Sequence, residues 1–524
     1  MKVLSINFSH DASVSVILDG ELVFYRMEER LVRKKHSSFP FYSLLEAKKN
    51  YDNFDLFVIN GLHSGDNILL HTNYWINFIK NLDCGATDDN IIVECQHHHL
   101  NHARTSFYHS GFEEALCIVL DGAGNIFENV LYDEMECREM ESIFYATKPN
   151  KFDLIYKRFF TGTSNNNYKN CKSISKQIKY YGDKLVDVEF SSNYSVGWKY
   201  ENCNRLIGFG DYDSGKSMGL SQCYGYENEI DEFWHEKAKI CNDTQKDTFQ
   251  QSLNLIETHL KLIKTKNLVI SGGYGLNCVS NYEYLNQLDV NIFIDPLCDD
   301  GCISIGAGFF HYFDTTKDFK NVKLKNVYLG YGENEYNLTG LNFEDCDDEK
   351  ISDLLIDQKI IALFQGKSEC GPRALGNRSI LFDPRNPNGK NILNLVKKRE
   401  SFRPFGATIL EEHCQEWFDL RGMESSPFML YAVKCKEHMR SKIPAVLHVD
   451  GTSRIQTVNS IQNENFYNLI NKFSQKTKIP MLLNTSFNIK GEPIVETFDD
   501  AINVFLNSKI DAVYLPEISK IILK

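Results

Sequence analysis

Alternating apolar and polar residues near the start of the chain predict three short β-strands. They lie at residues 3–8 (VLSINF), 13–18 (SVSVIL) and 21–27 (ELVFYRM), and short runs rich in Val, Ile and Phe are typical of strands. Asp19-Gly20, between the last two runs, is a hairpin-turn sequence. Further apolar runs at 116–120, 268–271 and 359–364 each lead into a loop that contains glycine. The pattern predicts an α/β protein whose strands end in polar loops.

The loop after residues 359–364 concentrates glycines and positive charge. It reads FQGKSECGPRALGNRSIL, and a helix-like segment follows it. Glycine lets backbone N–H groups approach a ligand closely, and guanidinium groups grip anionic oxygens in pairs. The loop therefore favours a phosphate or an acyl phosphate, with a solvated basic loop as the alternative. The candidate cations in this stretch are Lys367, Arg373, Arg378, Lys397, Arg399 and Arg403.

Length and composition limit the class of protein. At 524 residues, with 42% hydrophobic and 24% charged residues, the chain predicts a globular protein of two unequal domains. There is no apolar run long enough to span a membrane, and the first residues lack the apolar run of a signal peptide. Fifteen cysteines without a C-x-x-C pair favour free thiols in a reducing cytoplasm. The net charge of −13 argues against general wrapping by nucleic acid, but it allows a local basic patch.

Three of the predicted strands end in turns of a kind that binds phosphate. The first turn holds His10 and Asp11, and the second is Asp121-Gly-Ala-Gly124. The third, Gly272-Gly273-Tyr-Gly-Leu-Asn277, reads as a strand entering a helix through glycines. Backbone donors at such junctions suit a nucleotide. Three such turns on one chain therefore indicate a nucleotide site, with Gly272, Gly273 and Asn277 as candidates.

A cluster of histidines precedes the second of these turns. His98 and His102 are four residues apart, so on a helix they share one face and can bind one metal ion. Asp121 and Asp300 are carboxylates that can complete the site, whereas His97 and His99 lie off that face. Two imidazoles and two carboxylates suit Fe(II), Mn(II) or Zn(II). The alternative is a structural or solvent-facing histidine pair.

The motif GPRALGNRSIL, followed by FDPR and VKKRESFRPF, closely resembles the signature of the O-carbamoyltransferases of antibiotic and nodulation-factor biosynthesis. EERLVRKKHSSFP (28–40), GKSMGLSQ, HVDGTSRIQTV (448–458) and LLNTSFNIKGEPIV (482–495) also resemble that family, so the resemblance covers nearly the whole chain. It implies an actin-like, sugar-kinase-like (Kae1-like) ATPase domain over residues 1–335. A smaller YrdC-like α/β domain over residues 350–524 follows. Three positions depart from the family: Lys367, Cys370 and Ser453 stand where Arg, an aromatic residue and Ala are usual.

The resemblance also implies a reaction. The second domain is expected to make carbamoyl-adenylate from carbamoyl phosphate and ATP, with magnesium accompanying ATP. The first domain is expected to transfer the carbamoyl group to an acceptor hydroxyl beside an iron-type metal held by the two histidines and two aspartates. His10 is the expected general base, because imidazole titrates near neutrality. Asp11 and Lys35 are the other expected catalytic residues, and His36 is a further active-site candidate. Lys216 is expected near the nucleotide of the first domain, and Arg454, Asn484 and Ser486 in the carbamoyl phosphate and ATP site of the second.

One basic region departs from the family, at about residues 148–190. Residues 148–184 carry nine Lys or Arg against two Asp, a net charge of +7, with seven aromatic residues among them. Cations with interleaved rings suit a polyanion with unstacked bases, and the alternative is a surface hairpin whose rings pack underneath. Candidate contacts to single- or double-stranded DNA are Lys157, Arg158, Phe160, Lys169 and Tyr180.

The favoured acceptor is a hydroxymethylated base in nucleic acid, such as 5-hydroxymethylcytosine in DNA. A composition rich in Asn, Lys and Ile is in keeping with an AT-rich, virus-encoded protein that acts in a host cytoplasm. Three alternatives stay open: carbamoylation of a small natural product or sugar, a threonylcarbamoyl-type modification of tRNA, and a non-enzymatic ATP-binding regulator. The sequence leaves the oligomeric state, the metal and the path of the intermediate open.

Overall fold

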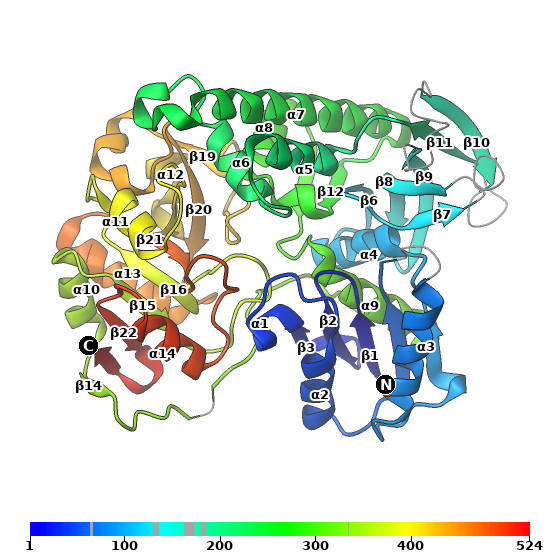
Figure 1. The fold of residues 1–524 in the computed structure, drawn as a ribbon, viewed down its shortest axis with the longest axis horizontal. Coiled ribbons are helices and arrows are strands. Elements are labelled where there is room, and N and C mark those ends of the chain that lie inside the picture. The colour runs from blue at the N-terminus through cyan, green and yellow to red at the C-terminus, as the bar shows by residue number, and fades with distance from the viewer. Residues whose placement is uncertain (63–66, 129–135, 162–172, 180–184, 334) are drawn as a thin grey trace.

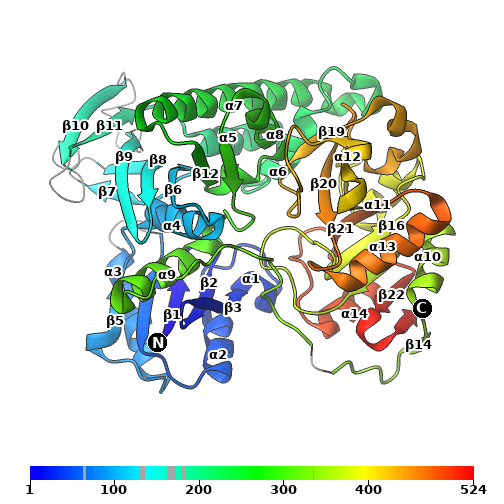
Figure 2. The ribbon, with the colours of Figure 1, turned by 180° about the vertical axis from the view of Figure 1, so that it is seen from behind.

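The computed structural model describes the chain except for residues 63–66, 129–135, 162–172, 180–184 and 334. Three β-sheets organise it: strands β1–β5, β6–β13 and β14–β23 each form one sheet. The first two sheets lie one above the other, and the third lies beside them (Figures 1 and 2). Among the described helices, none combines the length and apolar composition needed to cross a bilayer.

The first sheet has the strand order β3-β2-β1-β4-β5, with β1 antiparallel to β2 and parallel to β4. Asp19 and Gly20 both have positive φ, so the predicted hairpin is confirmed. Helices α1–α3 belong to this part of the chain. The bounds are β1 (Lys2–Asn7), β2 (Ser13–Leu18), β3 (Glu21–Met27), α1 (Glu28–Val32), α2 (Phe41–Asn50), β4 (Leu56–Asn60), α3 (Asn67–Lys80) and β5 (Ile91–Val93).

The second sheet repeats this order as β9-β8-β6-β12-β13, again with two antiparallel pairings followed by two parallel ones. Strands β11 and β10 extend it beyond β9, and β7 pairs with β8. The bounds are β6 (Glu114–Leu120), β7 (Ile126–Glu128), β8 (Glu136–Thr147), β9 (Lys151–Phe160), β10 (Ile174–Lys179), β11 (Leu185–Ser191), β12 (Asn267–Ser271) and β13 (Asn291–Ile294).

Two helices fill the space between the duplicated sheets. Helix α4 (His98–Ser110) packs on β6, β8 and β12, and α9 (Ile303–Thr316) packs on β1, β2 and β4. The two helices also pack against each other (Figure 1). Two sheets with the same strand order, joined through such helices, form the actin-like, sugar-kinase-like fold, so the predicted fold class of this part is confirmed.

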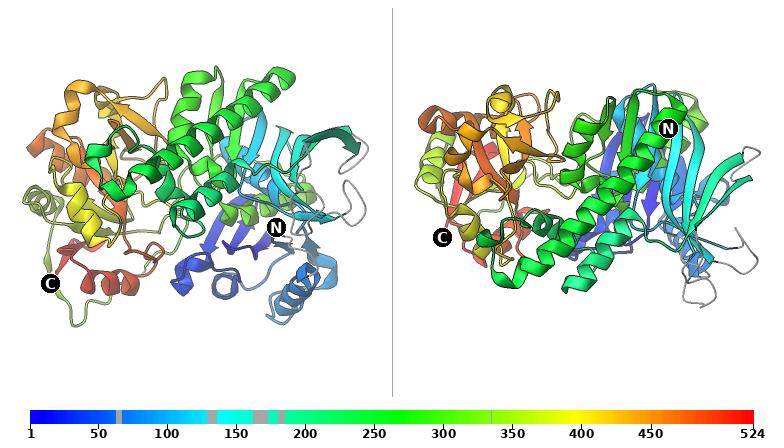
Figure 3. Two further views of the ribbon diagram at one scale, coloured as in Figure 1. Left: turned by 45° about the horizontal axis from the view of Figure 1, so that its top comes forward. Right: turned by 90° about the horizontal axis from the view of Figure 1, so that it is seen from above.

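Four further helices cover the outer face of the second sheet: α5 (Val196–Ile207), α6 (Ser214–Ser221), α7 (His235–Ile263) and α8 (Cys278–Gln287). The longest, α7, packs on α5, α6 and β6. It runs along the top of the molecule from the third sheet to the end of the second sheet (Figure 3).

The third sheet is a mixed ten-stranded sheet in a second α/β domain, with the order β14-β23-β22-β15-β16-β21-β17-β20-β19-β18. Its strands are β14 (Asn342–Asp345), β15 (Ile361–Phe364), β16 (Arg378–Phe382), β17 (Gly406–Leu410), β18 (Phe418–Asp419), β19 (Ala432–Cys435), β20 (Thr452–Val458), β21 (Met481–Ser486), β22 (Ala512–Leu515) and β23 (Lys520–Leu523). Its helices are α10 (Asp348–Ile356), α11 (Gly389–Val396), α12 (Cys414–Trp417), α13 (Glu464–Thr477) and α14 (Phe498–Leu506).

Candidate functional site

The sequence-predicted metal residues meet in space. Helix α4 begins at His98, and His102 follows one turn later on the same face. Asp121 comes directly after β6, and Asp300 lies in the turn before α9. The gap from His98 Nε2 to Asp121 Oδ2 is 3.4 Å, and that from His102 Nε2 to Asp300 Oδ1 is also 3.4 Å. All four side chains are buried, and one ligand atom from each lies within 4.8 Å of the others.

The four residues fit a divalent cation. His102 Nε2 and Asp300 Oδ2 are buried and make no well-aligned hydrogen bond within the described ranges, although the His10 imidazole lies 3.3 Å from Asp300 Oδ2. Buried polar atoms are normally paired, so converging orphan acceptors suit a cation. Burial alone would raise the pKa of Asp121, but the neighbouring imidazoles of His98, His102 and His99 hold that pKa well below its usual range. The carboxylate is therefore ionised and ready to bind metal.

We call His98, His102, Asp121 and Asp300 the metal quartet. A second polar group adjoins it. His10 Nδ1 lies 3.3 Å from Asp300 Oδ2, and His10 Nε2 lies 3.2 Å from Asp11 Oδ2. On its other side, Asp11 Oδ1 is 2.8 Å from His36 Nδ1. Tyr212 stacks on both imidazoles, with ring centroids 4.8 Å from that of His10 and 4.3 Å from that of His36. The two predicted phosphate-facing residues, His10 and Asp11, thus lie beside the metal quartet.

Carboxylates dominate the electrostatics of His10. Burial lowers its pKa, but Asp300 and Asp11 outweigh burial and raise the pKa to about 10. The carboxylates on both sides of the imidazole therefore favour its protonated form. A general base must instead be neutral, and Coulomb's law predicts that positive charge bound at Asp300 lowers the pKa of His10.

The second domain gathers several cations near the carboxylate of Glu400, whose Oε2 lies 3.6 Å from the Arg403 guanidinium. Burial, followed by repulsion from neighbouring cations, lowers the pKa of Arg373 to about 9 and that of Lys397 well below its usual range. Burial also lowers the pKa of Arg399, Arg403 and Arg454. Neighbouring cations add to this for Arg399, whereas for Arg403 the carboxylate of Glu400 opposes burial before Arg454 adds to it. Lys397 donates to the carbonyl of Ser486 (2.5 Å) and to Asn488 Oδ1 (2.8 Å). We call Lys35, Arg373, Lys397, Arg399, Arg403 and Arg454 the cation cluster.

The first domain contributes Lys35 to this cluster. Burial lowers the pKa of Lys35, Arg403 lowers it further, and Lys35 in turn lowers the pKa of Lys397. The next residue, His36, belongs to the group around Asp11. Two consecutive residues of the EERLVRKKH segment therefore face the two centres, which places those centres close together.

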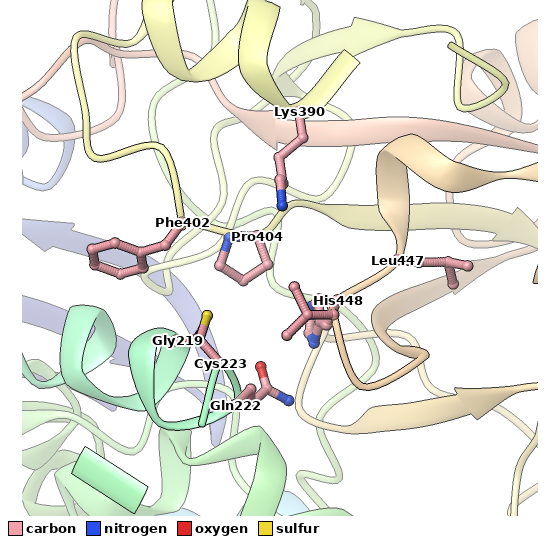
Figure 4. Close-up of a pocket in the computed structure, with 9 residues that line it drawn as sticks. Gly219, Gln222, Cys223, Lys390, Phe402, Pro404, Leu447 and His448 are labelled. Carbon is pink, nitrogen blue, oxygen red and sulfur yellow. Dashed lines mark hydrogen bonds between the residues drawn. The ribbon is translucent and has the colours of Figure 1, made fainter. Parts of the chain in front are cut away.

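Lys216 occupies the same junction. Its ammonium lies 2.7 Å from Asp213 Oδ2 and 3.7 Å from Glu400 Oε1 of the second domain. A small cavity separates α6 from the second domain nearby, and Gln222 and Lys390 approach it from opposite sides, with Pro404 and His448 between them (Figure 4).

The glycine turn after β12 contacts the loop that carries Asp121 of the metal quartet. Gly272 has φ +85° and passes so close to the Leu120 carbonyl that no side chain fits there. The Gly273 N–H donates to Asp121 Oδ1 at 3.2 Å. Asn277, predicted to bind nucleotide, is instead buried as the N-cap of α8 and bonds to Tyr200 and Gln245. Its amide is used inside the fold, and the nucleotide-binding role of Asn277 stays a prediction.

Three residues predicted to line the anion site also have different surroundings. The guanidinium of Arg378 is fully buried and donates to backbone carbonyls, including those of Gln365 (2.6 Å) and Tyr331 (3.0 Å), which makes it a structural brace. Lys367 is exposed and is not one of the cluster residues. Asn484 is buried, and its amide donates to Thr408 Oγ1 at 2.9 Å. The ligand-binding roles of Arg378, Lys367 and Asn484 stay predictions.

The described part of the basic region does not present its predicted DNA contacts to solvent. Lys157 is 2% exposed and forms an ion pair with Glu139. Arg158 makes a bidentate pair with Glu141 at 2.7 and 2.9 Å, and Phe160 is buried against Tyr194 and Trp198. These side chains are paired or packed inside, so their arrangement does not support the predicted contacts to DNA. Lys169 and Tyr180 lie outside the described residues.

Sequence reasoning missed His99 and Glu139. Both are buried behind the quartet, and His99 Nε2 lies 4.0 Å from Asp121 Oδ2. A strict four-residue spacing excluded His99. The signal that could have found it is the glycine of the following turn: a Cβ at Gly124 would collide with Glu139 Oε2 and His99 Nε2.

Two family models match the chain: carbamoyltransferase N-terminus over residues 61–309 and carbamoyltransferase C-terminus over residues 352–520. Nodulation protein NolO of Bradyrhizobium diazoefficiens is 30% identical over 464 residues, which cover 79% of this chain and 76% of that protein. Nodulation protein NolNO of Sinorhizobium fredii is 29% identical over 537 residues, covering 96% and 78% respectively.

Similarity to solved structures is weaker. Full-length HypF in its phosphate- and nucleotide-bound form aligns with 61% of this chain and 56% of its own, at 13% identity and a TM-score of 0.35, which is too low to carry an argument. The sequence matches carry the assignment instead. The first family match spans the whole metal quartet, and the second spans the second-domain members of the cation cluster. The chain therefore belongs to the carbamoyltransferase family, a family of transferases.

Proposed function

We propose that the chain is an ATP-dependent O-carbamoyltransferase that works in two steps through carbamoyl-adenylate. In the first step, carbamoyl phosphate, ATP and one water yield carbamoyl-adenylate, phosphate and pyrophosphate. In the second step an acceptor hydroxyl attacks the carbamoyl carbon, AMP leaves, and the hydroxyl proton passes to a base. The observation that carries the proposal is the adjacency of Lys35 and His36, one in the cation cluster and one beside the metal quartet.

The cation cluster supports the first step. Carbamoyl phosphate and ATP bring several negative charges, and a set of mutually repelling, largely enclosed cations is relieved by binding them. Arg373 and Arg454 are the strongest candidates, because the Nε atom of each is buried without a hydrogen-bond partner among the described residues. Lys397 and Ser486 lie side by side and would orient the transferred group.

The first domain supports the second step. His98, His102, Asp121 and Asp300 would hold a divalent cation, which supplies electrostatic stabilisation of negative charge on the leaving phosphate. Lys35 and Lys216 supply further positive charge from the protein. His10 Nδ1 would accept the proton of the acceptor hydroxyl, and Asp11, which lies 3.2 Å from Nε2, would orient that imidazole.

The acceptor is the open part of the proposal. A hydroxymethylated base in nucleic acid remains our working hypothesis, but the three described insert residues do not support it, since they are paired or packed inside. A hydroxyl of a sugar or small natural product needs no basic surface and is the competing acceptor class.

The test uses carbamoyl phosphate labelled in its carbamoyl carbon, with ATP, magnesium and Fe(II), and follows the label by mass spectrometry. DNA containing 5-hydroxymethylcytosine, unmodified DNA and a panel of sugars serve as acceptors. Label on one acceptor class identifies the substrate. Wild-type protein that makes no labelled adenylate would overturn the proposed mechanism.

His10→Ala separates the two steps. The variant should lose transfer by at least about 100-fold, the usual contribution of a general base, while labelled carbamoyl-adenylate accumulates. Lys397→Ala is the matched opposite and should stop adenylate formation itself. Loss of both steps in His10→Ala would contradict the assignment of His10.

A further inference from the structure

A buried polar network lies beneath the loop that carries Asp121. His99, the second residue of α4, is wholly buried, and its Nδ1 lies 2.9 Å from Ser142 Oγ of β8. Its Nε2 faces Asp121 Oδ2 at 4.0 Å and has no hydrogen-bond partner in the part of the chain that the structure describes. A buried imidazole nitrogen without a hydrogen-bond partner lowers the stability of the protein. Its presence therefore suggests a functional role.

Glu139 fixes the loop on the same side. Its carbonyl accepts from the Gly124 N–H at 2.9 Å, its N–H donates to the Asn125 carbonyl at 2.9 Å, and its Oε2 accepts from the Asn125 N–H at 3.1 Å. Lys157 neutralises this carboxylate. The loop therefore has little freedom to move away from His99.

A second acid–base pair holds the other end of the loop. A register shift in β8 between Glu139 and Glu141 interrupts its regular pairing with β9, and Glu141 pairs with Arg158. Glu141 also accepts the Val196 N–H at the start of α5, and the neighbouring Ser195 hydroxyl donates to the Gly122 carbonyl at 2.5 Å. Lys157 and Arg158 thus support the two buried carboxylates that clamp residues 121–125.

The loop rests directly on the imidazole. A side chain at Gly124 would collide with His99 Nε2, so glycine is what allows the close approach. If the Ser142 hydroxyl donates to Nδ1, the ring proton sits on Nε2, where it faces the Asp121 carboxylate. A shift of about 1 Å would turn the 4.0 Å gap into a charge-assisted hydrogen bond.

We propose that His99 is a positioning residue of the metal centre: its Nε2–H holds Asp121 Oδ2 so that the other carboxylate lone pairs face the cation. The inference rests on the metal centre of the proposed function, and it goes beyond that function by assigning a role to a residue outside the quartet. Hydrogen-bonded partners of metal ligands typically change metal affinity 10–100-fold.

Two variants of His99 separate positioning from packing. His99→Gln places an amide N–H near the original Nε2, whereas His99→Asn keeps a polar atom near Nδ1 and removes the donor that faces Asp121. Co(II) is the probe, and its visible absorption reports binding without any turnover. We expect His99→Asn to weaken Co(II) binding 10–100-fold and His99→Gln to stay within a few-fold of wild type.

Carbamoyl-adenylate formation by the second domain serves as the control for folding and should be unchanged in both variants. Equal Co(II) affinity of wild type and His99→Asn would overturn the inference alone, as would equal loss in both variants. Failure of the wild-type protein to bind Co(II) at all would overturn the metal centre of the proposed function and the inference with it.

Discussion

At the scale of single residues, Arg373 and Arg454 depart most from a balanced interior. Their Nε atoms are buried without partners in the described chain, burial lowers the pKa of both, and the charge of Arg454 lowers the pKa of Arg373 further. Cations held close together repel one another and lower the stability of the free protein. A bound anion removes this repulsion. This cost is a measurable signature of an anion site.

Pyrophosphate should therefore raise the melting temperature of the wild-type protein. At about one hundred times Kd, the linkage gives roughly 2.7 kcal/mol, or about 5 °C for a domain of this size. Arg454→Met should lose most of this shift and melt no lower than wild type without ligand, because it removes one of the repelling charges. Lys367→Met, an exposed cation outside the cluster, should keep the shift. A full shift in Arg454→Met would contradict the site.

His448 provides a pH prediction. Burial, and then the charges of Arg454 and Lys390, lower its pKa to about 4, against an ordinary value of 6.5, while Asp450 opposes them. The unfolded chain therefore binds the proton more readily, so stability rises with pH between about 4 and 6.5 and is lost on acidification. We expect the histidine to remove about 2 kcal/mol between pH 7.5 and pH 5.

His448→Asn is the variant that isolates this effect, because it keeps a polar atom near Nδ1, which bonds Thr452 Oγ1 at 3.0 Å. Thermal unfolding at pH 5 and pH 7.5 should show a smaller acid destabilisation in the variant than in wild type. The same pH dependence in both proteins would show that His448 does not carry it.

At the scale of helices and strands, local patterns predicted the elements that surround the site. The strands β1–β3, the Asp19-Gly20 turn and the apolar ends of β6, β12 and β15 follow from short apolar runs and turn residues. Asp121 could be named because it follows the apolar run of β6, and His98 and His102 because a spacing of four places them on one helix face. Asp300 entered as a carboxylate that can complete their site. The four residues could be proposed together as one site, but their distances could not be predicted, because tertiary packing of α4 against α9 brings them together.

The basic region shows where such reading fails. Charge composition treats every Lys as solvent-facing, yet Lys157 and Arg158 project from a strand onto the buried acids Glu139 and Glu141. The two acids lie on a different strand, and a register shift separates them, so no local pattern reveals the pairing. The sequence also did not reveal that the two sheets share one strand order, because β8 is twice the length of its counterpart β2 and shares no motif with it.

At the scale of the whole molecule, α1 joins the two domains. Arg33 donates to the carbonyls of Ile494 (2.6 Å) and Pro493 (3.0 Å) and lies 3.4 Å from Asp500, all in the second domain. Arg30 donates to the Gly371 carbonyl at 2.9 Å, at the start of the loop that carries Arg373. The segment that presents Lys35 and His36 to the two centres is thus held by both domains.

Weakening the contact between Arg33 and the second domain should let carbamoyl-adenylate escape between the two steps. In Arg33→Ala we expect adenylate formation to fall no more than a few-fold, because the second-domain cations remain. Carbamoyl-adenylate found free in solution should rise about tenfold, since losing contacts worth roughly 2–3 kcal/mol lets the segment open while the intermediate is bound. The measurement is labelled adenylate in the filtrate after rapid ultrafiltration, divided by the pyrophosphate released. Arg205→Ala, which removes a pair with Asp211 that is exposed on both sides and lies within the first domain, is the matched control and should behave as wild type. Equal escape from Arg33→Ala and Arg205→Ala would mean that the intermediate reaches the first domain without help from the α1 contact.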